Sequence, residues 1–383
     1  MEHIYLDHAS ATPIDPRVLE FALPYLKDKI GNPSSLHTAG QEARDAIEEA
    51  RQKIASLINA ENPNCIIFTG GATEANNLAL RGTAQRNPDK GKKLIASIIE
   101  HISVMNPLKE LKKNGWELTL IPVDNTGLID LTKLSETLTK DTVITSVMYG
   151  NNEIGTIQPI KEISRLVHSK GLYLHVDATA AAGRIPIDVQ KDGIDLLTLS
   201  SNDMYGPQGA GALYVKTGIR LQPVIIGGGQ ERGLRSGTEN IFAIVGMGEA
   251  ARIAQAEMSK ESPRLQTIRD KLISEMLKIE QAYLTGHPTQ RMPHHASFRF
   301  SRIEGESILL CMDMSDIQIA TGSACAAKTL EASHVLLAIG LKHEEAHGSM
   351  VITLGHSNNM DQIPLIVKAT QETVDRLRKL SPL

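Results

Sequence analysis

Short apolar runs alternate with amphipathic stretches along the first two thirds of the chain. The runs are nearly continuous, which is typical of strands buried on both faces of a parallel sheet. Helical patterns connect them, and Asp15-Pro16 predicts a helix start with proline at a tolerated position. We therefore expect an α/β fold with a mostly parallel sheet covered on both sides. The expected strands are 65–69, 94–99, 118–123, 142–149, 172–177, 194–199 and one starting near Ala212; the expected helices are 40–58, 70–82, 103–114, 130–139, 160–169, 241–258 and 362–380.

A glycine-rich segment, residues 227–240, interrupts the alternation of strands and helices before a long helical pattern. We place a domain boundary inside the helical region that follows it. The expected large α/β domain covers residues 15–260. Residues 1–14 and 261–383 are expected to form a smaller α+β domain that carries the loop around Cys325.

Composition excludes several classes of protein. The chain has 383 residues and a net charge of −4, so its charge gives no reason to expect binding to nucleic acid or to an anionic membrane. It contains no apolar run of about 18 residues that would predict a membrane span. The N-terminus lacks the basic and apolar regions of a signal peptide, so we expect a cytoplasmic protein.

The three cysteines are too few and too scattered for a disulfide framework or a CxxC metal site. Cys65 and Cys311 lie in apolar runs and are predicted to be core residues. Cys325 lies in TGSACAAK, a run of small residues that predicts a loop. A thiol in such a loop suits sulfur or metal chemistry, and the alternative is a small buried hydrophobic residue.

The stretch Ile194–Val215 combines a buried strand with a polar segment and a tight turn. Ser200, Ser201, Asn202 and Asp203 follow the strand, and the turn begins at Gly206. In α/β sheets, ligands bind just beyond the carboxyl ends of the strands. This stretch is therefore a candidate ligand site, with Asp203 at its centre.

Other strand ends carry polar residues as well. Gly70–Thr73 leads from a strand into a helix, which predicts either an anion site at the helix N-terminus or an ordinary turn capped by Thr73. Asp177 ends a strand, and its carboxylate either holds a protonated heteroaromatic nitrogen or caps the next helix. Asn152 is a side-chain donor near the same edge or a turn residue. His101 either stacks on a planar ring and moves protons or is a structural histidine.

Together these segments resemble the NifS/IscS-type cysteine desulfurases of the class V aminotransferase family, which have the fold type I of pyridoxal 5′-phosphate (PLP) enzymes. The resemblance covers essentially the whole chain. It implies a mostly parallel seven-stranded sheet in the large domain. The matching motifs are IYLDHASATPIDP, GNPSSLH, FTGGATEANNLA, Glu100-His101, NNEIG, HVDATAAAG, YGPQGAGALYV, GGGQERGLRSGTEN and TGSACA.

The resemblance implies a homodimer that binds PLP at its interface and acts on L-cysteine. Cys325 would attack the sulfur of L-cysteine, which yields L-alanine and a persulfide that passes to an IscU-type scaffold for iron–sulfur cluster assembly. The implied cofactor residues are Ala72, Thr73 and Ser200 near the phosphate, Thr238 reaching the phosphate from the partner subunit, His101 on the ring, Asp177 at the pyridine nitrogen and Asn152 near the ring hydroxyl.

The chain departs from the family pattern where the family has His-Lys before the Gly-Pro turn. Here these positions are Asn202 and Asp203. The lysine is the Schiff-base residue, and a carboxylate cannot form an imine. An anion at this place also opposes a phosphate; at ~6 Å and an effective dielectric of ~20, one pair of unit charges interacts by about 3 kcal/mol.

Three further departures concern the substrate side of the site. Ala180 stands where the family has glutamine, Val351 where it has the arginine that clamps the substrate carboxylate, and His356 where it has a second arginine. A bidentate guanidinium is not replaced by valine, and it is replaced only poorly by neutral histidine.

Three functions remain open from the sequence. The first is sulfur mobilisation with weak or absent desulfurase activity, in which Cys325 accepts sulfur or, as a hypothesis, ligates an iron–sulfur cluster. The second is a non-catalytic dimeric platform for an IscU-type scaffold. The third is an enzyme that uses non-covalent PLP or pyridoxamine phosphate, with Asp203 as the general base.

Overall fold

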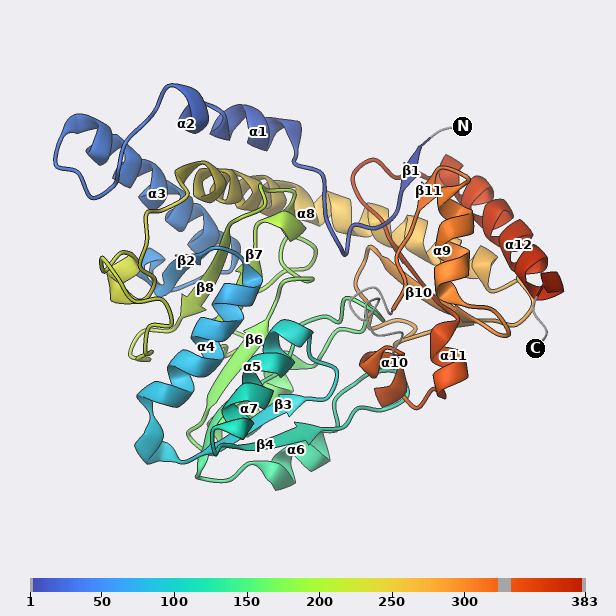
Figure 1. The fold of residues 1–383 in the computed structure, drawn as a ribbon, viewed down its shortest axis with the longest axis horizontal. Coiled ribbons are helices and arrows are strands. Elements are labelled where there is room, and N and C mark those ends of the chain that lie inside the picture. The colour runs from blue at the N-terminus through green and yellow to red at the C-terminus, as the bar shows by residue number, and fades with distance from the viewer. Residues whose placement is uncertain (1–2, 323–331, 381–383) are drawn as a thin grey trace.

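The computed structural model describes residues 3–322 and 332–380, and a seven-stranded sheet forms its centre (Figure 1). One strand runs antiparallel to both of its neighbours, and the other pairings in this sheet are parallel. The predicted α/β class with a mostly parallel sheet is confirmed. In spatial order the strands are β2 (Ile66–Thr69), β8 (Gly211–Val215, the antiparallel one), β7 (Leu196–Ser200), β6 (Tyr173–Asp177), β5 (Thr142–Ser146), β3 (Lys93–Ser97) and β4 (Glu117–Ile121).

Helices cover both faces of this sheet, which explains why its strands read as continuous apolar runs. Successive residues of β2 show the two faces: Ile66 and Phe68 belong to one apolar cluster, and Ile67 belongs to another. The first cluster includes residues of α1 (Pro16–Ala22), α3 (Thr38–Leu57), α6 (Leu131–Thr137), α7 (Ile160–His168) and α8 (Ile241–Met276), and the second includes residues of α4 (Ala72–Arg86) and α5 (Ile102–Lys113).

A separate apolar core lies in the C-terminal part of the chain. It joins Ile4 and Leu6 from the N-terminus to the second half of α8 and to the last helix. Its elements are the parallel pair β1 (Ile4–Tyr5) and β11 (Ile317–Gln318), the antiparallel sheet of β9 (Ala282–Leu284), β10 (His295–Phe300) and β12 (Ser349–Thr353), and the helices α9 (Gly305–Asp313) and α12 (Ile363–Leu380). The short helices α10 (His334–Ala338) and α11 (His343–His347) belong to another apolar cluster, which also contains Ile99, Met148 and Ile154.

Helix α8 is one continuous helix of 36 residues that passes from the first core to the second (Figure 1). Met247 packs in the first core, whereas Leu272 packs in the second. The helix therefore extends well beyond the predicted 241–258. The expected domain boundary at 260/261 falls inside α8, and the division into 15–260 and 1–14 plus 261–383 stays a prediction.

Most local predictions agree with the structure to within a few residues, and one core prediction is wrong. Asp15 caps α1 by accepting a hydrogen bond from the Arg17 backbone N–H. Cys65 is buried as expected, but Cys311 is only half-buried. The reason is that Cys311 lies on α9 beside α12, where its Sγ is 2.7 Å from Nη2 of the exposed Arg376.

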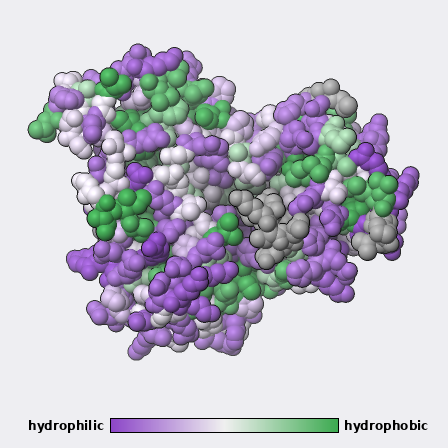
Figure 2. Space-filling model, viewed as in Figure 1, coloured by the Kyte–Doolittle hydropathy of each residue, from purple (hydrophilic) through white to green (hydrophobic). Residues whose placement is uncertain are grey.

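Large apolar side chains are exposed near the N-terminal helices. Leu26 lies in the short helix α2 (Pro24–Lys27), and Ile30 and Leu36 follow this helix; Leu36 is 96% exposed. Figure 2 shows hydrophobic surface at the corresponding upper left edge of the molecule. Such patches mark contact surfaces more often than isolated apolar residues do. Within the described ranges, no helix is long and apolar enough to cross a membrane.

The glycine-rich segment 227–240 is fixed to the sheet by one buried ion pair. The Glu231 carboxylate accepts hydrogen bonds from Nη1 and Nη2 of Arg51 at 2.8 Å each and from the Phe68 backbone N–H at 2.8 Å. Glu231 and Arg232 both have positive φ values, 47° and 57°, which non-glycine residues rarely adopt. The ion pair thus holds a strained backbone against β2.

Removing the Glu231 carboxylate should destabilise the fold strongly. Glu231→Ala leaves the Arg51 guanidinium buried without its main partner, which typically costs 3–5 kcal/mol. The matched control is Glu48→Ala, which removes the exposed partner of the same arginine at 3.1 Å. We expect that variant to lose less than about 1 kcal/mol in urea unfolding. Equal losses in both variants would contradict this account.

Candidate functional site

A cavity of about 100 Å³ opens where the parallel strands β2, β3, β5, β6 and β7 reach their carboxyl ends. Polar side chains from the loops after these strands meet there. Of the residues predicted from sequence, Ala72, Thr73, His101, Asn152, Asp177 and Asp203 all line it. The remaining lining residues are Ala9, Ser103, Met148, Gly150, Thr179 and Ala180.

Asp177 is held in a fixed orientation at the end of β6. Its Oδ2 accepts a hydrogen bond from Asn76 Nδ2 at 2.8 Å, and its Oδ1 accepts one from the Thr179 backbone N–H at 3.0 Å. Asn76 Nδ2 also lies 2.8 Å from the Ser103 hydroxyl, which in turn contacts His101 Nδ1 at 2.8 Å. A continuous chain of four polar side chains therefore links the carboxylate to the imidazole.

The sequence analysis did not identify Asn76 and Ser103, although their spacing from predicted site residues could have pointed to both. Asn76 follows Thr73 by three positions, so the two residues lie on neighbouring parts of the same helix face. Ser103 follows His101 by two positions, and its backbone N–H also donates to His101 Nδ1 at 3.2 Å. His101 thus serves as the N-cap of α5 and faces the cavity as well.

The N-terminus of α4 forms another part of the cavity wall, through Ala72 and Thr73. Gly71 has φ +152°, and a side chain at this position would point into open space. Strand β8 approaches so closely that a Cβ on Gly211 would lie 2.5 Å from the Gly71 carbonyl carbon. Backbone N–H groups at the start of this 15-residue helix, together with the exposed Thr73, make an anion site.

Asp203 lies in a 3-10 turn, Asn202–Met204, just after β7. Burial and, to a lesser extent, the nearby Asp177 charge raise the pKa of the Asp203 carboxyl to about 6, although a hydrogen bond with Ser200 opposes the shift. Ser200 is buried and, like Asn202, is not among the residues that line the cavity. The turn is held by Thr12, whose hydroxyl donates to the Asn202 carbonyl and accepts from the Tyr205 N–H at 3.0 Å.

Two further carboxyl groups near the cavity are buried. The pKa of Glu100 lies well above its ordinary value because burial disfavours the charged form. Its Oε1 accepts a hydrogen bond from the Met148 N–H at 2.7 Å. Burial also raises the pKa of Glu153 to about 7, against the effect of a hydrogen bond from Ser333. Neither carboxyl group is among the residues that line the cavity.

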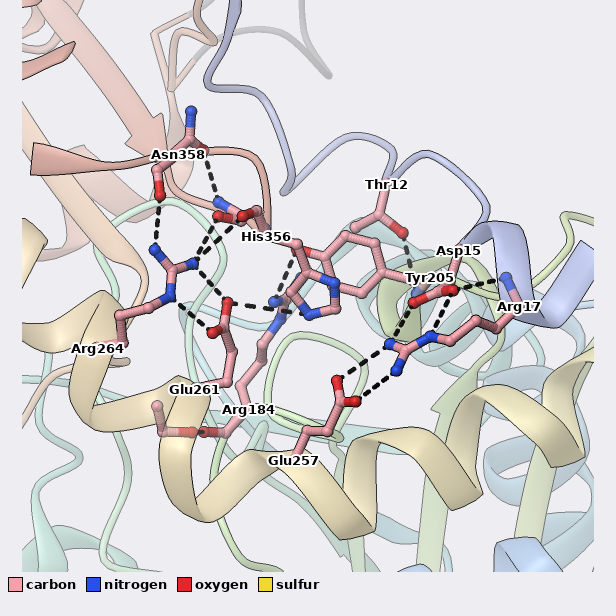
Figure 3. A network of polar contacts seen from close by, with 12 residues as sticks. Thr12, Asp15, Arg17, Arg184, Tyr205, Glu257, Glu261, Arg264, His356 and Asn358 are labelled. Carbon is pink, nitrogen blue, oxygen red and sulfur yellow. Dashed lines mark hydrogen bonds and ion pairs between the residues drawn. The ribbon is translucent and has the colours of Figure 1, made fainter. Parts of the chain in front are cut away.

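The structure shows the surroundings of the three residues that differ from the family pattern on the substrate side of the site. Ala180 leaves space at the cavity wall. Val351 is buried in β12, where it pairs with Ser297 and cannot bind an anion. His356 stacks on Tyr205 with ring centroids 4.0 Å apart, and its backbone N–H donates to the Tyr205 hydroxyl at 3.1 Å (Figure 3).

Two predicted residues do not belong to this cavity in the single chain. Thr238 is exposed on the loop fixed by Glu231, away from the cavity lining. Cys325 lies outside the described residues. Within residues 3–322 and 332–380, no group of three or more His, Cys, Asp or Glu side chains is arranged to hold a metal ion.

Comparison with known proteins decides the family. The model of the aminotransferase class-V family matches residues 4–376. The chain belongs to this family. It is 55% identical to "Cysteine desulfurase IscS 1" of Archaeoglobus fulgidus over 99% of both chains, and 45% identical to "Cysteine desulfurase IscS" of Dictyoglomus turgidum over 99% of this chain and 96% of that one.

Solved structures agree. A NifS-like protein superposes with a TM-score of 0.92 at 33% identity, covering 98% of this chain and 100% of that one. The NifS-like protein of Rickettsia africae gives a TM-score of 0.89 at 31% identity with the same coverage. The predicted fold type I and the resemblance to cysteine desulfurases are thus confirmed.

This family is PLP-dependent, and several residues that line the cavity fit this cofactor. Asp177 would hold the pyridine nitrogen, His101 would face the ring, and Thr73 with the α4 N–H groups would hold the phosphate. The buried Thr179 hydroxyl has no hydrogen-bond partner among the described residues and faces the same cavity. When bound, the cofactor supplies an electron sink for carbanion chemistry.

The raised pKa of Asp203 predicts a pH-dependent gain of stability in Asp203→Asn. An acid whose pKa is about 6 when folded and 3.8 when unfolded binds more protons in the folded state between these values. Its contribution to stability therefore falls as the pH rises from about 4 to about 6 and stays lost above that.

We expect Asp203→Asn to raise the free energy of unfolding by roughly 1–3 kcal/mol at pH 7.5 and to change it little at pH 4. Urea unfolding at both pH values measures this difference. The control, Asp45→Asn on the exposed face of α3, should change stability little at either pH. An equal effect of Asp203→Asn at both pH values would refute the shifted pKa.

Proposed function

We propose that this protein mobilises sulfur for iron–sulfur cluster assembly and that its own desulfurase activity is weak or absent. The observation that carries the proposal is Asp203. It occupies the place of the Schiff-base lysine in a cavity that keeps the oriented Asp177 and the chain of polar contacts to His101. Val351 supports the same proposal, because this apolar residue stands where the family has the arginine that binds the substrate carboxylate.

The sulfur chemistry is assigned to Cys325. Its thiolate would attack the outer sulfur of a donor persulfide, forming a new S–S bond while the donor thiolate leaves. No oxidant is needed, because the persulfide bond of the donor is exchanged for that of the acceptor. A persulfide or thiolate at this place would then serve an IscU-type scaffold, either as a sulfur source or as a ligand of the nascent cluster.

A homodimer is part of the proposal. Relatives of this kind are generally dimeric, and two features of this chain support the same state. Exposed apolar side chains at Leu26, Ile30 and Leu36 offer a surface for a second copy. Thr238 is exposed and lies outside the cavity of its own chain, as a residue that serves the cavity of a partner must.

A second candidate function is an enzyme with non-covalent PLP or pyridoxamine phosphate. The pKa of Asp203, about 6, favours it, because a general base works best when its pKa lies near the working pH. An absorbance titration with PLP distinguishes the two functions. Saturable binding that is lost on dialysis, together with turnover of an amino acid, supports the second; sulfide release from L-cysteine at ordinary desulfurase rates would contradict the first.

Cys325→Ser should abolish sulfur loading. After incubation with an active desulfurase and L-cysteine, we expect the native protein to gain the mass of one sulfur atom and the variant to gain none. Intact-mass measurement with and without a reductant checks this result. Cys65→Ser and Cys311→Ser are matched controls that should load normally. Equal loading of Cys325→Ser would remove the assigned role of this residue.

Asp203→Lys should restore covalent attachment of PLP but little turnover. The new amine can form the link, whereas Val351 still leaves the substrate carboxylate without its guanidinium. Borohydride reduction followed by intact-mass measurement detects the link, and sulfide release from L-cysteine measures turnover. The double variant with Val351→Arg should be faster than the single one. Full turnover of Asp203→Lys alone would show that the missing arginine is unimportant.

A further inference from the structure

The chain between β1 and α1, residues 6–15 and hereafter the N-terminal segment, runs from the second core to the first (Figure 1). Its Leu6 packs in the second core, and its Ala9 lines the candidate cofactor cavity. Its Thr12 forms hydrogen bonds with the turn that carries Asp203. Release of the N-terminal segment would therefore open one side of the cavity and free the Asp203 turn.

His8 lies in the middle of the N-terminal segment and is tightly enclosed. It is 3% exposed, and neither ring nitrogen has a hydrogen-bond partner among the described residues. The ring of Tyr5 meets it edge-on, with centroids 4.9 Å apart. A Cβ on Gly355 would lie 2.3 Å from His8 Cε1, so the backbone after β12 packs directly on the ring. A protonated imidazole has an N–H at both nitrogens, and this enclosure provides neither with a good acceptor.

The side chain of Asn358 lies beside His8, but its amide has other partners. Its Oδ1 accepts a hydrogen bond from the Gly355 N–H at 2.7 Å, and its Nδ2 donates to the Tyr5 carbonyl at 3.2 Å and to Gln362 Oε1 at 3.1 Å. Contact with Asn358 favours a proton on His8, but it does so less than burial and nearby positive charge disfavour one.

Titratable groups from several elements surround His8. They are Tyr5 and Asp7 beside it in the chain, Arg184 in the turn after β6, Asp203 and Tyr205 in the turn after β7, His294 and His295 around the start of β10, and His356 in the loop after β12.

Arg184 provides the fixed positive charge of this group. It is 5% exposed, and its guanidinium lies over the Tyr205 ring, 4.6 Å from the centroid (Figure 3). Asp203 opposes this charge, as the one acid among the described residues that line the small cavity between His8 and Arg184. A proton on His8 would place a second positive charge beside Arg184, in surroundings that exclude water.

The direction of the pH effect follows from the surroundings of His8. Burial, and to a lesser extent the charges of Arg184 and His356, lower the pKa of His8 to about 3. A histidine released into water titrates near pH ~6.5. Between these values the released segment binds more protons than the packed one, so the packed arrangement loses stability as the pH falls below about 6.5. For this one group, the ratio of released to packed forms rises about thirty-fold from pH 7.5 to pH 5.

Asp203 acts in the opposite direction. Its pKa is raised to about 6, so a proton taken up there in acid favours the packed arrangement. The effect of His8 is therefore isolated by comparing two proteins that both contain Asp203 and differ only at residue 8.

We infer that the N-terminal segment is an acid-sensitive latch, in which protonation of His8 releases the segment from the loop after β12 and from the Asp203 turn and opens the cofactor cavity. The geometry carries this inference, because the packed segment encloses only an uncharged imidazole, beside a buried guanidinium. The inference goes beyond the proposed function and depends neither on Cys325 nor on a bound cofactor.

Hydrogen–deuterium exchange at pH 7.5 and pH 5, read by mass spectrometry and corrected for the intrinsic exchange rate at each pH, tests the latch. We expect amides of the N-terminal segment to lose protection in acid, while those of β6 keep theirs. His8→Phe retains an aromatic ring that cannot take up a proton. Its acid-induced loss of protection should be smaller than that of the native protein by up to about thirty-fold. His343→Phe, at an exposed histidine, is the matched control and should behave like the native protein.

The outcomes that contradict the latch are distinct. Losses in native protein and His8→Phe that agree within three-fold would overturn it, as would an equal loss of protection in β6, which would indicate global unfolding. If His8→Phe fails to fold, Arg184→Gln keeps His8 and removes the facing cation. The acid-induced loss should then be several-fold smaller than in the native protein, and an unchanged loss would again overturn the inference. Persulfide loading of Cys325 at pH 7.5 is the same in either case, so failure of the latch leaves the proposed function intact.

Discussion

Charge balance at the carboxyl ends of the parallel strands is the constraint on which the rest of the site depends. Asp177 is fixed there by Asn76 and by backbone, and Asp203 adds a second carboxyl group to the same cavity. A lysine at 203 would have balanced Asp177. The aspartate instead adds a second acid, whose pKa is raised chiefly by burial and to a lesser extent by the Asp177 charge. The charge of the buried Arg184 opposes the rise in the Asp203 pKa, so these two residues belong to one electrostatic arrangement.

The sequence predicted the sheet well because its signals are local. Apolar runs such as Ile66–Thr69 identify strands without knowledge of their neighbours, and residues directly after strand ends must meet at one edge. This rule brought His101, Asn152, Asp177 and Asp203 to one cavity from residue patterns alone. Only the family resemblance showed that Asp203 stands where the family has its Schiff-base lysine; composition and spacing do not reveal this.

Features that depend on contacts distant in sequence were not predictable in this way. Arg184 looked like one of many basic residues, because its burial and its contact with the Tyr205 hydroxyl depend on segments that are distant in sequence. Cys311 lies in an apolar run, yet the position of α12 leaves it beside Arg376. The full length of α8 was missed as well, because a polar segment that contains Pro263 separates the apolar positions of its two halves.

The course of α8 has a mechanical consequence. The chain passes between the two cores along this helix and along the segment that joins β1 to α1, so no flexible linker at residue 260 separates them. Pro263 lies inside the helix between its last contact with the first core, near Ile253, and its first with the second, Leu265. Because proline lacks an N–H, one backbone hydrogen bond is missing there. Any relative movement of the two cores would therefore concentrate as bending at this turn, which is adjacent to Glu261 and Arg264 and hence to the stacked rings of Tyr205 and His356.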